Sequence, residues 1–192
     1  MAHPRDRRRL SPEDVWALPV HGGADDLPQA LALVSSLDPA DSDSVLSSIL
    51  WGIRDLLGRA GLGRVTVEGG EAGEPLPIPG TDETTLAGRL PGELRGTADD
   101  VDFGRLPFVP LYRTGDEFAA EISNPTVHGV LHLGWAEQAG GGYQAQMAVY
   151  VKPRGRLGEG YMALIRPFRH WIVYPALMRQ IERAWSARRP AS

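Results

Sequence analysis

The spacing of hydrophobic residues divides the chain into regions of two different periods. Apolar and polar residues alternate in four consecutive runs, at residues 108–113, 117–123, 127–136 and 143–152. An alternation with a period of two predicts β-strands. Short connections rich in Gly, Asn, Asp and Pro separate these runs, so we expect the strands to form an antiparallel meander.

Between residues 157 and 185 the apolar residues recur instead at every third or fourth position. They are Tyr161, Leu164, Ile165, Phe168, Trp171, Ile172, Met178, Ile181 and Trp185. This stripe predicts a long amphipathic helix whose apolar face must be covered. Upstream, residues 27–37 and 44–57 have helical spacing, and the run at 15–20, which contains Pro19, predicts an edge strand. We therefore expect an α+β fold in which a curved antiparallel sheet wraps around the C-terminal helix.

The third of the four runs contains two histidines on one side of the predicted strand. His128 and His132 alternate with the apolar residues Leu131 and Leu133, as Tyr150 alternates with Met147 in the next run. Matching the two apolar faces puts both histidines beside Tyr150. A slip of one residue would turn them toward the core instead, because side chains alternate along a strand. The sequence leaves both registers open.

The amino-acid composition indicates the general class of protein but not its activity. Hydrophobic residues make up 42% of the 192 residues, charged residues make up 23%, and the net charge is −4. These values are ordinary for one globular domain and give no reason to expect a nucleic-acid partner. Cysteine is absent, which excludes disulfides and thiolate chemistry. The start of the chain lacks the apolar segment of a signal peptide, so we expect a cytoplasmic protein without integral membrane association.

We expect one domain at residues 15–186, between a flexible basic tail at 1–14 and a short tail at 187–192. Residues 68–107 are rich in Gly and Pro and form an irregular insertion in this domain. Loops of this length usually either pack irregularly on a domain or cover a binding site. Both interpretations stay open, as does a homodimer.

Three stretches resemble a known superfamily. They are NPTVHGVLHLGW at residues 124–135, QMAVYVKPRGRLGEGYMALIRPFRH at 146–170 and IVYPALMR at 172–179. Together with the order of elements they resemble the START and pollen-allergen-like superfamily, SRPBCC, and within it a bacterial family catalogued as a domain of unknown function. The resemblance implies a helix-grip fold with an apolar cavity between the sheet and the last helix. It implies binding of lipids, sterols, polyketides or similar molecules, and it brings no catalytic residues.

The candidate site residues follow from side-chain chemistry and from that implied cavity. The catalytic candidates are His128, His132 and Glu121, because imidazole and carboxylate groups can exchange protons near neutral pH. The ligand-binding candidates are His132, Met147, Tyr150, Tyr161, Ile165, Arg166, Phe168 and His170. Strand positions four apart are separated by about 13 Å, so the two strand histidines do not fit one metal ion. We expect neither a metal nor a cofactor.

Three classes of function remain at this stage. The leading hypothesis is a protein that binds a small hydrophobic or amphipathic molecule between the sheet and the C-terminal helix. The second is a cyclase-like or dehydratase-like enzyme that uses a strand histidine and Glu121 as acid and base. The third is an interaction or peripheral membrane module that exposes Trp171, Tyr174 and Trp185. A shared fold cannot choose among them, because function depends on the site.

Overall fold

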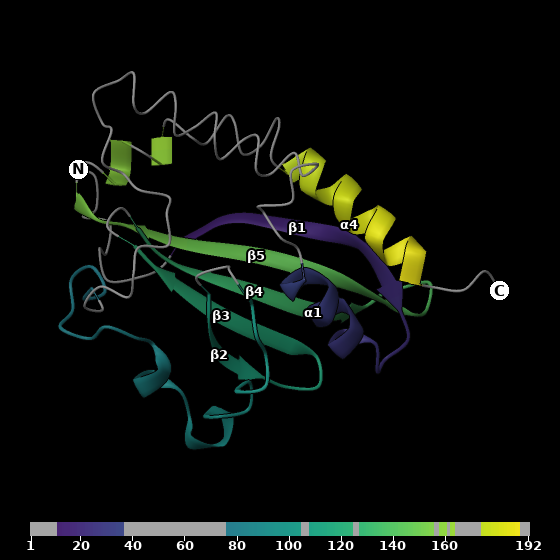
Figure 1. Ribbon diagram of the computed structural model, residues 1–192, viewed down its shortest axis with the longest axis horizontal. Helices are drawn as coiled ribbons and strands as arrows, with labels where there is room; N and C mark the ends of the chain where they lie inside the picture. Colours follow the sequence, from purple (N-terminus) through teal and green to yellow (C-terminus); the bar gives the residue numbers. More distant parts are fainter. Residues whose placement is uncertain are drawn as a thin grey trace.

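The structure is a computed structural model that describes residues 11–36, 76–104, 108–124, 127–155, 158–160, 162–163 and 174–188. These residues form an α+β fold with a C-terminal helix (Figure 1). The elements are β1 (Ser11–Gly22), α1 (Leu27–Ser35), 3-10 turns at Ala87–Arg89 and Gly92–Leu94, β2 (Val109–Arg113), β3 (Glu117–Ser123), β4 (Val127–Glu137), β5 (Tyr143–Pro153) and α4 (Tyr174–Arg188).

The strands form one open antiparallel sheet in the order β1-β5-β4-β3-β2. The predicted meander from β2 to β5 is confirmed, and so is the edge position of β1. The first strand is longer than predicted, because it begins at Ser11 and pairs along β5 from Val151 to Tyr143. Its pairing is irregular between Ala17 and His21, the segment that contains Pro19, which cannot donate to a ladder.

The register between β4 and β5 matches apolar residues to apolar residues. Leu131 lies opposite Val149, and Leu133 lies opposite Met147. We call the face that carries these four side chains the core face and the other the outer face. Since side chains alternate, both strand histidines lie on the outer face with Tyr150. The first of the two registers left open by the sequence is therefore the correct one.

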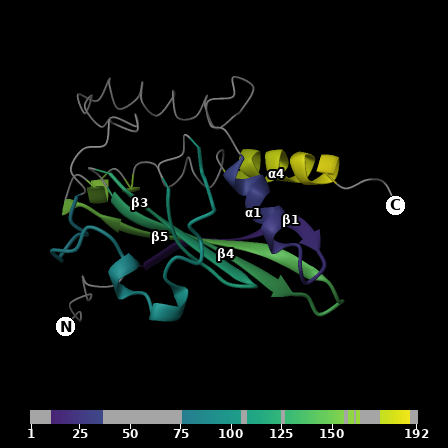
Figure 2. The same cartoon turned by 60° about the horizontal axis from the view of Figure 1, so that its bottom comes forward.

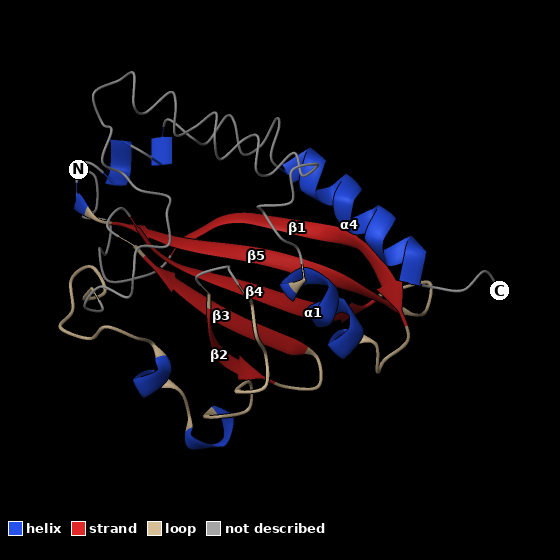
Figure 3. Cartoon of the chain, viewed as in Figure 1, coloured by secondary structure: helices blue, strands red, loops and turns tan. Residues whose placement is uncertain are grey.

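Helices α1 and α4 cover the core face (Figures 1 and 3). The rings of Trp16 in β1 and Tyr174 in α4 lie 4.8 Å apart. Trp185 of α4 is buried, and its Nε1 donates a hydrogen bond to the carbonyl of His21. Phe118 of β3 is completely buried in the same cluster. Burial of these large side chains against both helices supplies the main driving force for folding.

The insertion contributes to both faces of the sheet. We call residues 76–94 the strap; it lies on the side of the sheet away from α4, as the 3-10 turns in Figure 2 show. Further along, Ala98 and Phe103 join the core, where the ring of Phe103 lies 5.8 Å from that of Phe118. The described part of the insertion therefore packs on the sheet, as one of the two interpretations predicts.

Several predicted features lie outside the described residues. They are the helix at 44–57 and the ligand-binding candidates Tyr161, Ile165, Arg166, Phe168 and His170. Among the helices that the structure does describe, none combines the length and the apolar character needed to cross a membrane.

Candidate functional site

The outer face carries the same Glu–His arrangement twice. Glu117 and Glu121 are four residues apart in β3, and His128 and His132 are four residues apart in β4. Glu117 lies opposite Gly134 and Glu121 lies opposite Val130, so each glutamate has a histidine two positions from its partner. Side chains on such a diagonal are within reach of each other. In both pairs His Nε2 lies 3.5 Å from Glu Oε2.

The first pair is partly open to solvent. His132 is 27% exposed and Glu117 is 47% exposed. Tyr112 of β2 donates a hydrogen bond of 3.2 Å to Oε2 of Glu117, the same oxygen that His132 approaches. We call Tyr112, Glu117 and His132 the open site. It brings together a carboxylate, a phenol that is hydrogen-bonded to it and an imidazole at 3.5 Å from it.

The phenol of the open site stays protonated over the ordinary pH range. Burial raises the pKa of Tyr112 above its usual value of 10.0, and the charge of Glu117, its hydrogen bond and the nearby Tyr150 raise it further. A neutral phenol is a hydrogen-bond donor. Tyr112 is therefore a fixed donor to the carboxylate, while Tyr150 supplies a second hydroxyl on the same face.

The second pair, Glu121 and His128, is covered by the strap, and we call it the covered pair. His128 is completely buried and Glu121 is 4% exposed. The hydroxyl of Thr85 donates to Oε1 of Glu121, and the amide of Leu86 donates to Oε2 at 3.0 Å. Within the described part of the chain, neither ring nitrogen of His128 has a hydrogen-bond partner.

The imidazole of the covered pair is neutral at neutral pH. Burial lowers the pKa of His128 below 6.5, the positive charges of Arg154 and Lys152 lower it further, and Glu121 alone opposes them. The short distance between Glu121 and His128 is consequently not a salt bridge under these conditions. Chemically, this pair is a carboxylate beside an uncharged imidazole.

Arg154 joins the strap to the ends of the strands. Its Nε donates to the carbonyl of Asn124 at 2.7 Å, its Nη2 to the hydroxyl of Ser123 at 2.7 Å, and its Nη1 to the carbonyl of Pro77. Charged donors make strong hydrogen bonds to such acceptors. With its donors occupied in this way, the guanidinium has a structural role at this corner.

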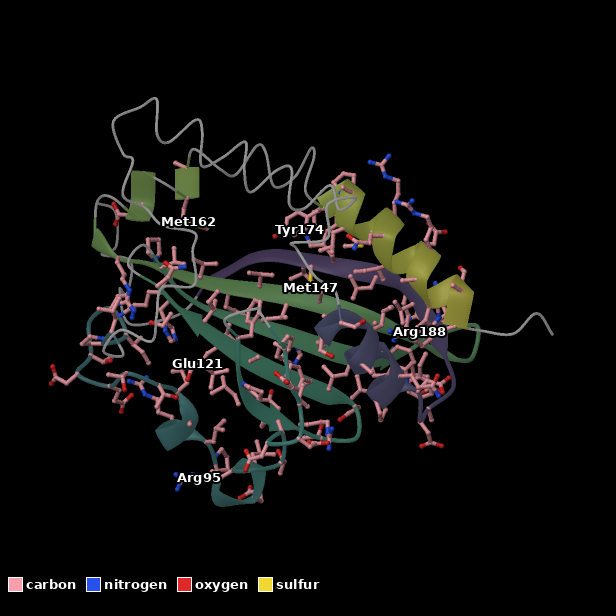
Figure 4. All side chains as sticks on the ribbon, viewed as in Figure 1. Arg95, Glu121, Met147, Met162, Tyr174 and Arg188 are labelled. Atoms are coloured by element: carbon pink, nitrogen blue, oxygen red, sulfur yellow. The ribbon has the colours of Figure 1, made fainter. Side chains whose placement is uncertain are left out.

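The structure separates the sequence-predicted site residues into two groups. His132, Tyr150, Glu121 and His128 lie on the outer face, whereas Met147 lies on the core face near Tyr174 (Figure 4). Alternation along β4 and β5 keeps the two groups on opposite sides of the sheet. Met147 would therefore face a cavity between the sheet and α4, whereas His132 and Tyr150 would not.

Three residues in or next to these pairs are not among the site residues predicted from the sequence. Glu117 is the partner of His132, Tyr112 shares the same carboxylate, and Thr85 covers Glu121. The equal spacing of the two glutamates and the two histidines in neighbouring strands was the available signal for Glu117. No pattern in the irregular insertion identifies Thr85. Among the described residues, no group of three or more metal-ligating side chains is placed to hold an ion.

A family model described as "Protein of unknown function (DUF2867)" matches residues 8–176. The chain belongs to the DUF2867 family. The matched segment of this DUF2867 protein includes all five strands and therefore both Glu–His pairs. Comparisons with curated proteins and with solved structures find no match. The chemistry of the two pairs must therefore carry the functional argument.

Proposed function

We propose that this DUF2867 protein binds a small amphipathic molecule at the open site on the outer face. One observation carries the proposal: the side chains of Tyr112 and His132 meet at a single oxygen of Glu117, whose side chain is partly exposed. Ligand sites typically combine a few converging polar groups with apolar walls. Small apolar side chains on the same face, from Ala119, Val130 and Ala148, supply such surroundings.

The composition of the open site indicates which ligand chemistry fits. The Glu117 carboxylate accepts hydrogen bonds, and the imidazole of His132 can donate or accept one. A hydroxyl or amine on the ligand would satisfy the carboxylate, and an apolar body would pack on the half-buried side chain of Val130, beside the buried alanines. This chemistry favours a hydroxylated or amino-bearing amphipathic molecule over a purely hydrophobic one.

The ligand position differs from the one that the family resemblance implies. We infer that the fold is the helix-grip arrangement of the SRPBCC superfamily, in which a ligand would lie between the sheet and the last helix. Pairing of β1 with β5 and packing of α4 on the core face support the fold. The polar anchors support the outer face as the binding position. We place this activity in the cytoplasm, in keeping with the cysteine-free composition.

Native mass spectrometry of the purified protein, followed by thermal shifts with fatty acids, sterols and aromatic polyketides, tests the proposal. A hydroxylated member should bind, and the variants Glu117→Gln and Tyr112→Phe should each weaken binding by about tenfold or more, since a hydrogen bond to a charged group contributes about 1.5–3 kcal/mol. Gln146→Ala, an exposed position on the same face of β5, is the matched control. Binding that no outer-face variant alters would overturn the proposed position, and absence of any binding would overturn the function.

A second candidate function is acid–base catalysis on the bound molecule. The specific observation is that Glu117 contacts Nε2 of His132, which orients the ring and leaves Nδ1 for a ligand. His132 would then remove a proton from a carbon of the ligand while the hydroxyl group of Tyr150 gives a proton to a departing hydroxyl, as in a dehydration. Turnover of a bound hydroxylated ligand that His132→Gln abolishes without changing its binding would establish this function.

The interaction-module hypothesis receives no support from the residues it needs. Tyr174 and Trp185 are each 6% exposed, because α4 turns them into the core against β1. Buried aromatic side chains cannot serve as a contact surface for a membrane or partner. The third aromatic residue, Trp171, lies outside the described residues.

A further inference from the structure

The strap is attached to the outer face mainly by polar contacts. Of its side chains only that of Ile78 is buried. Its short ion pair between Arg89 and Glu83 is internal to the strap and half-exposed, so it does not hold the strap to the sheet. Segments with few buried apolar contacts open at low cost in free energy. The strap, which Arg154 also holds through the carbonyl of Pro77, can thus detach from the sheet at low cost in free energy.

One carboxylate holds the middle of the strap. Glu121 accepts the hydroxyl of Thr85 on one oxygen and the amide of Leu86 on the other. The Thr85 oxygen in turn accepts the amide of Ala87 at 3.1 Å, which starts the first 3-10 turn. Whatever changes the hydrogen bonding of Glu121 therefore changes the attachment of the strap.

His128 stands directly behind this carboxylate, with Nε2 at 3.5 Å from Oε2 of Glu121. Among the described residues, the charged groups that face it are Glu121 from β3, Lys152 from β5 and Arg154, which follows the end of β5. On the strap, Asp82 is exposed and Glu83 is paired with Arg89, so the strap brings no compensating charge. The imidazole is fully buried and, among the described residues, has no hydrogen-bond partner.

We propose that the strap is a proton-controlled lid, which protonation of His128 releases from Glu121. In the closed form a charged imidazole would be buried away from water, would face the cations Lys152 and Arg154, and would have to compete with Thr85 and Leu86 for the carboxylate of Glu121. Lifting the strap gives the imidazolium access to water. The proton therefore binds the open form more strongly, and binding to one of two states shifts the population toward that state.

The direction of the effect follows from linkage. His128 has a lowered pKa in the closed form and an ordinary one, about 6.5, when exposed to water. Above the ordinary pKa the equilibrium constant for closure has its full value. Below that pKa it falls by up to about tenfold per pH unit, until the pH reaches the lowered pKa of the closed form. Mild acid is therefore the opening signal.

Opening of the strap would enlarge the surface that is available to the proposed ligand. This consequence depends on the proposed function, whereas the lid itself does not. The open site and the covered pair lie on the same face of the same two strands. Their residues are four positions apart along each strand, which is a distance of about 13 Å. With the strap lifted, an amphipathic ligand longer than the open site could contact both pairs. Binding of such a ligand would strengthen in mild acid, whereas binding of a short one would not.

Hydrogen exchange of the ligand-free protein tests the lid independently of any ligand. The Leu86 amide, which donates to Glu121, is the reporter, with its rate corrected for intrinsic exchange at each pH. Its protection factor should fall by about threefold to tenfold between about pH 7.5 and pH 5.5. In His128→Gln, which cannot be protonated, it should be constant over that range. His132→Gln, with the same diagonal geometry in the open site, is the matched control and should behave as the wild type.

A second variant keeps the test decisive if His128→Gln does not fold. Thr85→Val removes one of the two strap bonds to Glu121, so it should lower Leu86 protection by about fivefold at neutral pH and keep the acid-dependent fall. Protection that does not change with pH in the wild type, or that falls equally in His128→Gln, would overturn the proposal. A pH-dependent lid combined with no ligand binding would leave the lid standing and overturn only the proposed function.

Discussion

The two Glu–His pairs on the outer face have the same distance between their side chains but different chemical character. The distance between imidazole and carboxylate is 3.5 Å in both pairs, but His132 is partly exposed whereas His128 is completely buried. Water is in contact with the side chain of His132, and it cannot reach that of His128. Exposure, more than the identity of the partner, thus decides that the covered pair holds a neutral imidazole.

At the open site the coupling between Tyr112 and Glu117 can be measured without a ligand. Replacing Glu117 by Gln removes a negative charge and a charge-assisted hydrogen bond, two of the causes that raise the pKa of Tyr112. Glu117→Gln should therefore lower the pH at which Tyr112 ionises. Ultraviolet absorbance titration of phenolate formation measures this, and Tyr112→Phe identifies the phase that belongs to Tyr112. An unchanged phase would show that the two side chains are not in contact.

At the scale of elements, the connection between β1 and α1 leaves no room for a side chain at Gly22, the last residue of β1. A methyl group there would lie 2.4 Å from Oδ2 and 2.9 Å from Cβ of Asp26. Asp26 cannot move freely, because its Oδ2 accepts the amide of Gly23 at 2.8 Å and α1 begins at the next residue. Gly22→Ala should thus displace α1, whose side chains Leu27 and Leu31 are buried.

We expect Gly22→Ala to lower the free energy of unfolding by about 1–3 kcal/mol, as overpacking of a close contact does. Urea unfolding of the purified variant measures the change. Gly140→Ala is the matched control, because a methyl group there meets no atom within 4 Å, and it should change stability by less than about 0.5 kcal/mol. Equal effects of the two substitutions would contradict the packing of α1 against this connection.

The elements differ in how far the sequence predicts them. The alternation of Leu131, Leu133 and Met147 with polar residues predicted the two strands and their antiparallel pairing, but it left two registers open, of which the structure has the one that matches the apolar faces. The length of β1 was not predictable, since its first residues form a strand only by pairing with β5. The strap has no periodicity at all, and its contact with Glu121 joins residues 35 and 36 positions apart. For this reason the sequence could not tell the covered histidine from the open one.

At the scale of the whole molecule, the buried imidazole makes stability depend on pH. The unfolded chain binds a proton at His128 near pH 6.5, whereas the folded chain does so only at lower pH because burial lowers the pKa. The contribution of His128 is therefore fully present above about pH 6.5 and is lost as pH falls toward the lowered pKa. The free energy of unfolding should fall by at most about 1.4 kcal/mol per pH unit in that interval.

Urea unfolding of the wild type and of His128→Gln over the same pH range isolates this contribution, since all other titrating groups are common to both. The difference between the two free energies should change with pH only below about pH 6.5. If the strap opens before the rest of the chain unfolds, the open folded form already has an ordinary histidine, and the difference should become constant once opening is complete. A steep fall that continues to lower pH would mean that the strap unfolds together with the sheet. Parallel curves at every pH would show that His128 is not buried in the folded protein.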